Sequence, residues 1–250
     1  MCAGRENLME KQFAQWMEEE CSQIGVTLSE KQMEQFFQYY EMLIQWNEVM
    51  NLTAITEYED VIIKHFADSL LSYKVIDLSN VDSLIDVGTG AGFPGIPLKI
   101  VFPQMKVTLL DSLKKRINFL NEVIDELGLE NVECIHGRAE DFGHDAEYRE
   151  QYDLCVSRAV ANLSTLSEYC LPFIKVGGKF VSYKAANIDE ELNNAKNAIK
   201  KLGGNISDTK TMELPNSDEI ERNFVIIDKI SKLSNKYPRK SGIPSREPLS

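Results

Sequence analysis

Apolar positions in the first 75 residues recur at helical spacing. One stripe covers residues 6–24, and a second begins after Ser29. Ser29 and Gln32 have the spacing of a capping box, and so do Thr56 and Glu59, which precede "DVIIKHFADSLLSY". We therefore predict helices and no strand in this region. The apolar members of the stripes are Leu8, Phe13, Trp16, Met17 and Ile24, then Met33, Phe36, Phe37, Tyr40, Leu43 and Ile44.

From residue 81 the pattern changes to short apolar runs that alternate with helical stretches. This alternation is typical of βαβ units, so it predicts a mostly parallel sheet with helices on both faces. The predicted strands are 83–87, 106–111, 132–137, 152–157 and 178–184, and the predicted helices are about 95–102, 113–127, 162–170 and 188–201.

The last two apolar runs predict a hairpin. "SDTKTMEL" and "RNFVIIDKI" are joined by the polar segment "PNSDEIE", which suits an antiparallel pair at the edge of the sheet. A class I methyltransferase that uses S-adenosylmethionine (SAM) has such a hairpin, and a plain dinucleotide-binding domain usually lacks it. We therefore predict a Rossmann-like α/β fold with a seven-stranded sheet. The predicted regions are an N-terminal helical extension (1–75), a methyltransferase domain (76–234) and a basic C-terminal tail (235–250).

Charge separates the tail from the rest of the chain. The net charge of the 250 residues is −12, which argues against a protein that coats nucleic acid indiscriminately. Residues 229–250 carry six basic residues and one acid, a charge of +5, so the remaining 228 residues carry −17. The tail is either a phosphate-contacting segment or a solubilising, partly disordered terminus. The basic residues are Lys229, Lys232, Lys236, Arg239, Lys240 and Arg246.

Composition argues for a cytoplasmic protein without a structural metal. We find no secretory signal in "MCAGRENLME" and no apolar run of the roughly 18 residues that a membrane helix needs. Five scattered cysteines and only three histidines make a structural zinc site improbable and fit a reducing compartment. We therefore expect no metal and no membrane partner.

The stretch "DVGTGAGFPG" follows the first predicted strand and fits two glycine patterns. Read from Gly88 it gives G-x-G-x-G, which suggests a SAM loop formed by Gly88, Gly90 and Gly92. Read from Gly90 it gives G-x-G-x-x-G, the dinucleotide fingerprint completed by Gly95. In both cases glycines let the backbone pass close to a ligand at the start of a helix. The loop alone does not choose between a methyltransferase and an oxidoreductase.

Two aspartates lie at the ends of the first two strands. Asp86 suits the ammonium group of SAM, directly or through water, and would be poorly placed beside a pyrophosphate; alternatively it binds the N–H groups of its own loop. Asp111 can accept hydrogen bonds from ribose hydroxyls, which serves NAD and SAM alike, or it caps the following helix. Asp86 therefore favours the register that starts at Gly88, and Gly95 then becomes a helix-start residue beside Pro94.

The turns after the third and fourth strands indicate which kinds of atom a methyltransferase with this sequence could methylate. Methyltransferases use the turn after the third strand to meet the adenine, so in "GRAEDF" the candidates are Ala139 and Glu140, through their backbone more than through their side chains. "SRAVANL" lacks the (Asp/Asn)-Pro-Pro-(aromatic) turn used to methylate exocyclic amines, and Cys155 lies inside the strand, where we interpret it as a core residue and not a nucleophile. A guanine N7 has an in-plane lone pair and no proton, so positioning suffices. Arg158 could fix the cofactor carboxylate or the base, or form a structural ion pair.

In combination these motifs resemble the bacterial small-subunit rRNA guanine-N7 methyltransferase family (the RsmG/GidB family). The quoted stretches are "WNEVMNLTAIT", "HFADSL", "DVGTGAGFPGIPLKI", "GRAED", "SRAVANL" and "KYPRKSGIPSREPL", over roughly residues 40–250. The resemblance implies SAM-dependent methylation of N7 of one guanine in the 530 loop of 16S rRNA, without a general base. It places the cofactor contacts of the family on Gly88, Phe93, Ala139, Glu140 and Arg158.

The resemblance also gives meaning to the tail. Tyr237 could stack on a base while Arg239, Lys240 and Arg246 meet phosphates, and Lys184 would lie on the face where the substrate enters. His65, Asp68 and Ser69 share one helix face, where they could close over the cofactor or pack the lobe.

Four interpretations of function remain at this point. The first is a monomeric SAM-dependent enzyme that acts on 16S rRNA or the small ribosomal subunit. The second is a SAM-dependent methyltransferase of another RNA, a protein or a small molecule. The third is an NAD-binding oxidoreductase, for which the loops after the later strands offer no convincing proton donor. The fourth is a non-catalytic ribosome-binding factor that retains SAM.

Overall fold

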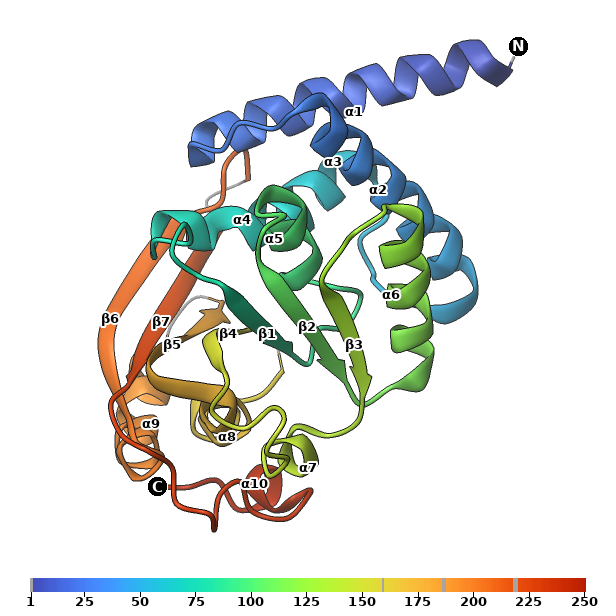
Figure 1. Ribbon diagram of the computed structural model, residues 1–250. Coiled ribbons are helices and arrows are strands. Elements are labelled where there is room, and N and C mark those ends of the chain that lie inside the picture. Colours follow the sequence, from blue (N-terminus) through green and yellow to red (C-terminus); the bar gives the residue numbers. More distant parts are fainter. Residues whose placement is uncertain (1, 159, 186–187, 218–219) are drawn as a thin grey trace.

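The computed structural model describes residues 2–158, 160–185, 188–217 and 220–250, with side chains from Leu8 onward. Its centre is a seven-stranded sheet of order β3-β2-β1-β4-β5-β7-β6 (Figure 1). β1 to β5 are parallel, and β7 is antiparallel to both β5 and β6. The predicted Rossmann-like sheet with its terminal hairpin is confirmed. The strands are β1 (Ser83–Val87), β2 (Lys106–Asp111), β3 (Val132–His136), β4 (Tyr152–Arg158), β5 (Ile174–Lys184), β6 (Gly204–Glu213) and β7 (Glu221–Lys229).

Helices cover both faces of the sheet (Figure 1). The N-terminal helices, α5 and α6 lie on one face, and α8 and α9 lie on the other. The first face carries α1 (Cys2–Ile24), α2 (Glu30–Met50), α3 (Tyr58–Val61), the π-helix η1 (Ile62–Ala67), α4 (Asp68–Leu70), the 3-10 helix η2 (Leu71–Lys74), α5 (Gly95–Val101) and α6 (Lys114–Glu126). The remaining helices are α7 (Ala139–Phe142), α8 (Leu163–Cys170), the 3-10 helix η3 (Leu171–Phe173), α9 (Asp189–Lys201) and α10 (Ile243–Arg246).

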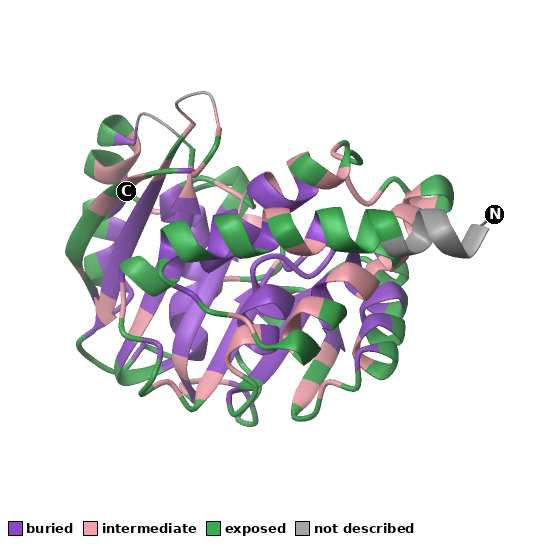
Figure 2. Cartoon of the chain, turned by 90° about the horizontal axis from the view of Figure 1, so that it is seen from above, coloured by how far each residue is buried: buried purple, intermediate pink, exposed green. Residues whose placement is uncertain are grey.

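Strand side chains alternate between two hydrophobic clusters, one on each face of the sheet. Leu84 of β1 belongs to the cluster that includes the N-terminal helices, and Ile85 belongs to the cluster under α8 and α9. Figure 2 shows the buried strands at the centre and the exposed faces of the helices around them. The N-terminal helices thus share one core with the sheet, and Tyr237 of the tail belongs to the other core.

One of the two predicted capping boxes forms. The Ser29 side chain accepts from the Gln32 N–H, and the Gln32 side chain accepts from the Ser29 N–H, so α2 begins as predicted. The second prediction is wrong. The helix that follows has Glu57 as its N-cap, without a side-chain hydrogen bond, so it begins one residue later than the Thr56 capping box requires.

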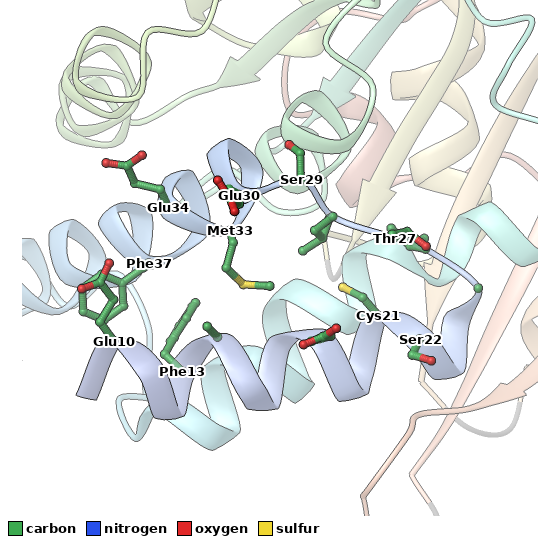
Figure 3. A pocket seen from close by; sticks show the side chains of 15 residues that line it. Glu10, Phe13, Cys21, Ser22, Thr27, Ser29, Glu30, Met33, Glu34 and Phe37 are labelled. Atoms are coloured by element: carbon green, nitrogen blue, oxygen red, sulfur yellow. The ribbon is translucent and has the colours of Figure 1, made fainter. Parts of the chain in front are cut away.

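A groove of about 760 Å³ lies between α1 and α2 (Figure 3). Phe13 and Met33 point toward each other across the groove, and four of the residues that line it are glutamates. All residues that line the groove fall between Glu10 and Phe37, so none belongs to the glycine loop. The glutamates are Glu10, Glu18, Glu30 and Glu34.

Across the described ranges, no helix is both long and apolar enough to span a membrane.

Candidate functional site

The glycine loop connects β1 to α5 in a backbone conformation that requires glycine. Gly88, Gly90 and Gly92 have φ angles of 74°, 65° and 100°, in the left-handed region. The N–H groups of Gly88 and Thr89 donate to the Leu110 carbonyl, which ties the loop to β2. The three glycines of the register that starts at Gly88 therefore form one continuous turn.

Gly95 has a different role. Its φ is not positive, and α5 begins at this residue, as predicted. A Cβ atom here would lie 2.9 Å from Asp86 Oδ2 and would collide with the Leu109 side chain. Close packing of the helix start against β1 and β2 therefore explains the glycine that completes the dinucleotide pattern.

Asp86 is fully buried beneath the loop. Its Oδ2 accepts from the Thr89 hydroxyl at 2.7 Å and from the Gly95 N–H at 2.9 Å, which is the loop-binding role given above as the alternative. Its Oδ1 has no partner among the described residues. Burial raises the pKa of Asp86 to about 6, although both hydrogen bonds oppose this rise. The second oxygen is thus an unsatisfied acceptor that a cationic ligand group would stabilise; binding to the ammonium of SAM stays a prediction.

Asp111 supports the same loop from β2. Its Oδ2 accepts from the Gly90 N–H at 3.0 Å and from Arg116, and its Oδ1 accepts from the Leu113 N–H at 2.8 Å. The N-cap of α6 is Leu113, so Asp111 braces the turn before the helix and does not itself cap it. The Asp111 carboxylate therefore ties the glycine loop to the end of β2, and its contact with ribose hydroxyls stays a prediction.

The turn after β3 contacts the C-terminal tail. α7 begins at Ala139, and the buried Glu140 accepts from the Gly242 N–H at 2.8 Å. The two residues predicted to meet the adenine thus lie where the tail returns to the sheet. Their contact with a cofactor is not tested by this geometry and stays a prediction.

Two residues near the end of β4, Cys155 and Ser157, are fully buried. Cys155 is completely buried, and burial raises the pKa of its thiol well above the usual range, so its interpretation as a core residue is confirmed. Ser157 donates to the Val87 carbonyl at 2.7 Å and so joins β4 to the end of β1. Val160 packs over Gly88, where a Cβ would lie only 2.6 Å from its Cγ2. Ala159, the remaining residue of this turn, lies outside the described residues.

Arg158 lies at the centre of a cluster that joins β4 to the N-terminal helices. Its Nη1 donates to Asp68 Oδ2 at 2.7 Å, which is the ion pair considered above as the alternative role. The guanidinium carbon lies 5.1 Å from the centre of the Phe93 ring. The His65 ring stacks on the same Phe93 ring at 4.6 Å and 17°. Residues of the glycine loop, β4 and the N-terminal lobe therefore form one wall of the site.

His65 is held in one protonation state. Burial and the neighbouring charge of Arg158 lower the pKa of His65 to about 3, so the ring is neutral. Its Nδ1 lies 3.4 Å from Arg158 Nη2, a donor, so Nδ1 is the acceptor and Nε2 donates to the Thr53 hydroxyl at 2.8 Å. Ser69 donates to the His65 carbonyl. In the predicted group, Asp68 and Ser69 are thus buried and His65 is half-buried, and the three residues pack the lobe against the site.

Tyr39 binds the glycine loop, and the sequence did not identify it as a site residue. Its hydroxyl donates to the Ala91 carbonyl in the middle of the glycine loop, and a Cβ at Gly92 would lie 2.6 Å from the Tyr39 oxygen. In the sequence Tyr39 belongs to the aromatic run "FFQYY" of α2, a pattern that predicts a core residue. Nothing in the periodicity distinguishes a core tyrosine from one that binds a loop 52 residues away.

The predicted RNA-contacting residues have two kinds of environment. Arg239 forms hydrogen bonds with both carboxylate oxygens of the buried Glu168, and the Tyr237 ring is 7% exposed. Lys184 donates to the Ala161 carbonyl and to Glu191. By contrast, Lys240 and Arg246 are exposed. The tail is thus folded against α7 and α8, with part of its positive charge facing outward; RNA contact by these residues stays a prediction.

Comparison with known proteins gives similarity over most of the chain. Residues 32–224 match the family described as "GidB: rRNA small subunit methyltransferase G". The chain is 52% identical over 229 residues to the ribosomal RNA small subunit methyltransferase G of Alkaliphilus metalliredigens, covering 92% of this chain and 95% of the relative. It is 54% identical over 231 residues to the protein of the same name from Acetivibrio thermocellus, covering 92% and 94%.

Similar solved structures support the fold. The Methanococcus jannaschii fibrillarin pre-rRNA processing protein has a TM-score of 0.51 and 18% identity, covering 66% of this chain and 74% of that one. Methanococcus jannaschii TYW2, crystallised with AdoMet, has a TM-score of 0.50 and 18% identity, covering 65% and 77%. At this level of identity the likeness concerns the arrangement of strands and helices alone.

Proposed function

Because the chain belongs to the rRNA small subunit methyltransferase G family, we propose that it transfers a methyl group from SAM to N7 of a guanine in the 530 loop of 16S rRNA. The observation that carries this proposal is the match of 193 consecutive positions, residues 32–224, to that family. The geometry of the glycine loop and its surroundings supports the same activity.

The residues at the end of β1 fit SAM better than a dinucleotide. SAM supplies an electrophilic methyl group on a sulfonium, together with a cationic ammonium and an anionic carboxylate. Asp86 offers a buried carboxylate with one unsatisfied oxygen to a cation, and Arg158 offers a guanidinium to an anion. A pyrophosphate beside Asp86 would add negative charge to a buried acid. Gly88, Gly90 and Gly92 let the backbone approach the ligand. We propose that Asp111 also accepts from ribose hydroxyls, beside the donors of Gly90, Leu113 and Arg116 that it already binds.

The chain needs to orient the guanine and exclude water, because N7 carries no proton to remove. Effective positioning alone accounts for a large part of such rate enhancements, on the order of 7–11 kcal/mol in favourable cases. His65 is neutral and its ring nitrogens both have partners, and Cys155 is buried as a thiol. We therefore assign neither residue a role as general base or nucleophile.

The exposed part of the folded tail supports an RNA partner. Lys240 and Arg246 face solvent and are free to meet phosphates, whereas Arg239 and Tyr237 fix the tail against α8. We propose that the first pair contributes to RNA affinity directly and the second pair through the shape of the tail. We further propose a monomer that acts in the cytoplasm on the small ribosomal subunit, without a metal.

The test is methyl transfer to small subunits that lack the modification. Purified protein and labelled SAM are mixed with 30S particles, or with protein-free 16S rRNA, from a strain without the enzyme, and the labelled nucleotide is mapped by mass spectrometry. One methyl group at N7 of one 530-loop guanine is expected. A methyl group elsewhere, or none on either substrate, would overturn the proposal, and SAM binding without turnover would favour a non-catalytic binding factor.

A further inference from the structure

Asp68 is a buried carboxylate held between two arginines from different strands. It is 1% exposed and begins α4, directly after the π-helix η1. Its Oδ2 accepts from Arg158 Nη1 at 2.7 Å, and its Oδ1 accepts from Arg222 Nε at 2.8 Å. β4 and β7, which carry the two arginines, are separated by β5 in the sheet. A residue of the N-terminal lobe thus joins two strands at the edge of the candidate site.

We propose that Asp68 is a positioning residue that holds the guanidinium of Arg158 in the orientation in which it binds the carboxylate of SAM, with Arg222 fixing Asp68 from the other side. This inference rests on the proposed function, since it takes SAM as the ligand. It assigns to the N-terminal lobe a part in cofactor binding.

The hydrogen bonds of Arg158 leave one edge of its guanidinium available. Nη1 donates to Asp68 and to the Lys64 carbonyl, and Nη2 approaches His65 Nδ1. A guanidinium has five N–H donors, of which Nε–H and one Nη2–H have no recorded partner in the described part of the chain. The Nε and Nη2 edge is the side on which arginine binds a carboxylate with two parallel hydrogen bonds. Asp68 and the Lys64 carbonyl therefore engage Nη1, which leaves Nε–H and one Nη2–H for an anionic ligand.

The surroundings of Arg158 restrict its movement. The guanidinium is placed over Phe93, which belongs to the glycine loop, and the neutral His65 stacks on the same ring. Without the Asp68 carboxylate, a long arginine side chain could adopt other rotamers and would lose this placement. Asp68 is in turn held by Arg222, so the orientation of Arg158 depends on a buried carboxylate with an ion pair on each of its oxygens.

A purely structural role makes a different prediction. If the two ion pairs only tie the N-terminal lobe to the sheet, loss of Asp68 lowers the free energy of unfolding and leaves the SAM affinity of the folded protein unchanged in either background. If Asp68 acts through Arg158, its effect on SAM affinity disappears once Arg158 is removed. A double-mutant cycle measures this coupling directly.

The experiment measures the Kd of SAM by calorimetry for the full-length protein and the variants Asp68→Asn, Arg158→Ala and the double variant. The matched control is Asp60→Asn, which removes an exposed carboxylate from the Lys64 ion pair two turns earlier. We expect Asp68→Asn to raise the Kd by about tenfold, the scale of loss that follows when a residue that orients a metal ligand is removed. The same change in the Arg158→Ala background should alter the Kd by less than about twofold. The control should leave the Kd unchanged.

Equal losses of affinity in both backgrounds, or an unchanged Kd in Asp68→Asn, would overturn the inference. Since breaking a buried ion pair destabilises a protein, each variant is first checked by thermal unfolding. If Asp68→Asn does not fold, Arg222→Gln replaces it in the same cycle, because it frees Asp68 while keeping the Arg158 pair. Wild-type protein that binds SAM but methylates no rRNA would contradict the proposed function and leave the cycle interpretable. Wild-type protein that binds no SAM would overturn both.

Discussion

Replacing Asp86 with asparagine should make the folded protein more stable near neutral pH and should weaken SAM binding. Asparagine keeps an acceptor for the Thr89 hydroxyl and the Gly95 N–H, the two donors that reach Oδ2. It removes a charge from a completely buried side chain whose second oxygen has no partner in the described structure. The substitution therefore separates the two roles considered for Asp86, because loop binding needs the acceptor and ligand binding needs the charge.

The magnitude follows from the pKa of Asp86, which burial raises from 3.8 to about 6. Between these values the folded protein binds more protons at this group than the unfolded chain does, so its contribution to stability decreases as pH rises. That contribution is about 1.4 kcal/mol at about pH 5 and close to zero at about pH 7.5. Relative to Asp86→Asn, the wild-type protein should thus lose about 1.4 kcal/mol of unfolding free energy between these two conditions.

Urea unfolding of both proteins at about pH 5 and about pH 7.5 gives the four free energies. Asp125→Asn, which changes an exposed aspartate of α6, serves as the control and should show no such difference. Calorimetry at about pH 7.5 should give a Kd for SAM about tenfold higher in Asp86→Asn, corresponding to about 1.4 kcal/mol for the lost charge. A wild-type pH dependence identical to that of the variant would refute the raised pKa. Normal SAM affinity in the variant would refute the role of the charge and leave Asp86 as a residue that only binds the loop.

Three further substitutions test other parts of the site. Tyr39→Phe deprives the Ala91 carbonyl of its donor, so thermal unfolding should show a free energy of unfolding lower by about 1–3 kcal/mol, and SAM should bind more weakly. An unchanged melting temperature would contradict this contact. Cys155→Ala should retain methyl transfer, because burial holds the pKa of the thiol high and keeps it from acting as a nucleophile; a folded but inactive variant would contradict this. Arg239→Met leaves the buried Glu168 carboxylate without its ion pair and should destabilise the protein by about 3 kcal/mol and expose the tail to proteolysis. If the Arg239→Met variant resists trypsin as well as the wild-type protein does, Arg239 does not anchor the tail.

The fold could be predicted because each strand and helix leaves its signal in a short stretch of sequence: an apolar run for a strand, and apolar residues at helical spacing for a helix. The apolar runs of β1 and β2 are flanked by turns and polar residues, so the predicted limits agree with those observed. β5 begins at Ile174, four residues before the predicted start at Gly178. Gly177 has a φ of 91°, and the pairing of β5 with β4 shifts register in this region. A bulged strand start of this kind contains glycines that resemble a loop in the sequence.

The contacts around the site were less accessible because they join distant parts of the chain. The spacing of His65 and Asp68 correctly placed them on one side of a helix, although the segment is a π-helix and not the expected regular α-helix. The partners of Asp68 lie 90 and 154 residues further along the chain, and no local pattern identifies them. The tail shows the same limit of sequence patterns. From the sequence, Arg239 was expected to contact phosphate, whereas in the structure it binds Glu168, which lies 71 residues earlier in the chain.

The two arginines that bind Asp68 lie far from it in the sequence, and this affects the order in which the cluster can form during synthesis. The N-terminal helices leave the translating ribosome first, but the arginines that bind Asp68 follow only with β4 and β7, the latter near the end of the chain. Contacts at such separations close late in folding, because the intervening chain has to be ordered first. A nascent chain interrupted before Arg222 therefore lacks the donor that binds Asp68 Oδ1. The proposed orientation of Arg158 by Asp68 is thus complete only in a chain that has reached β7.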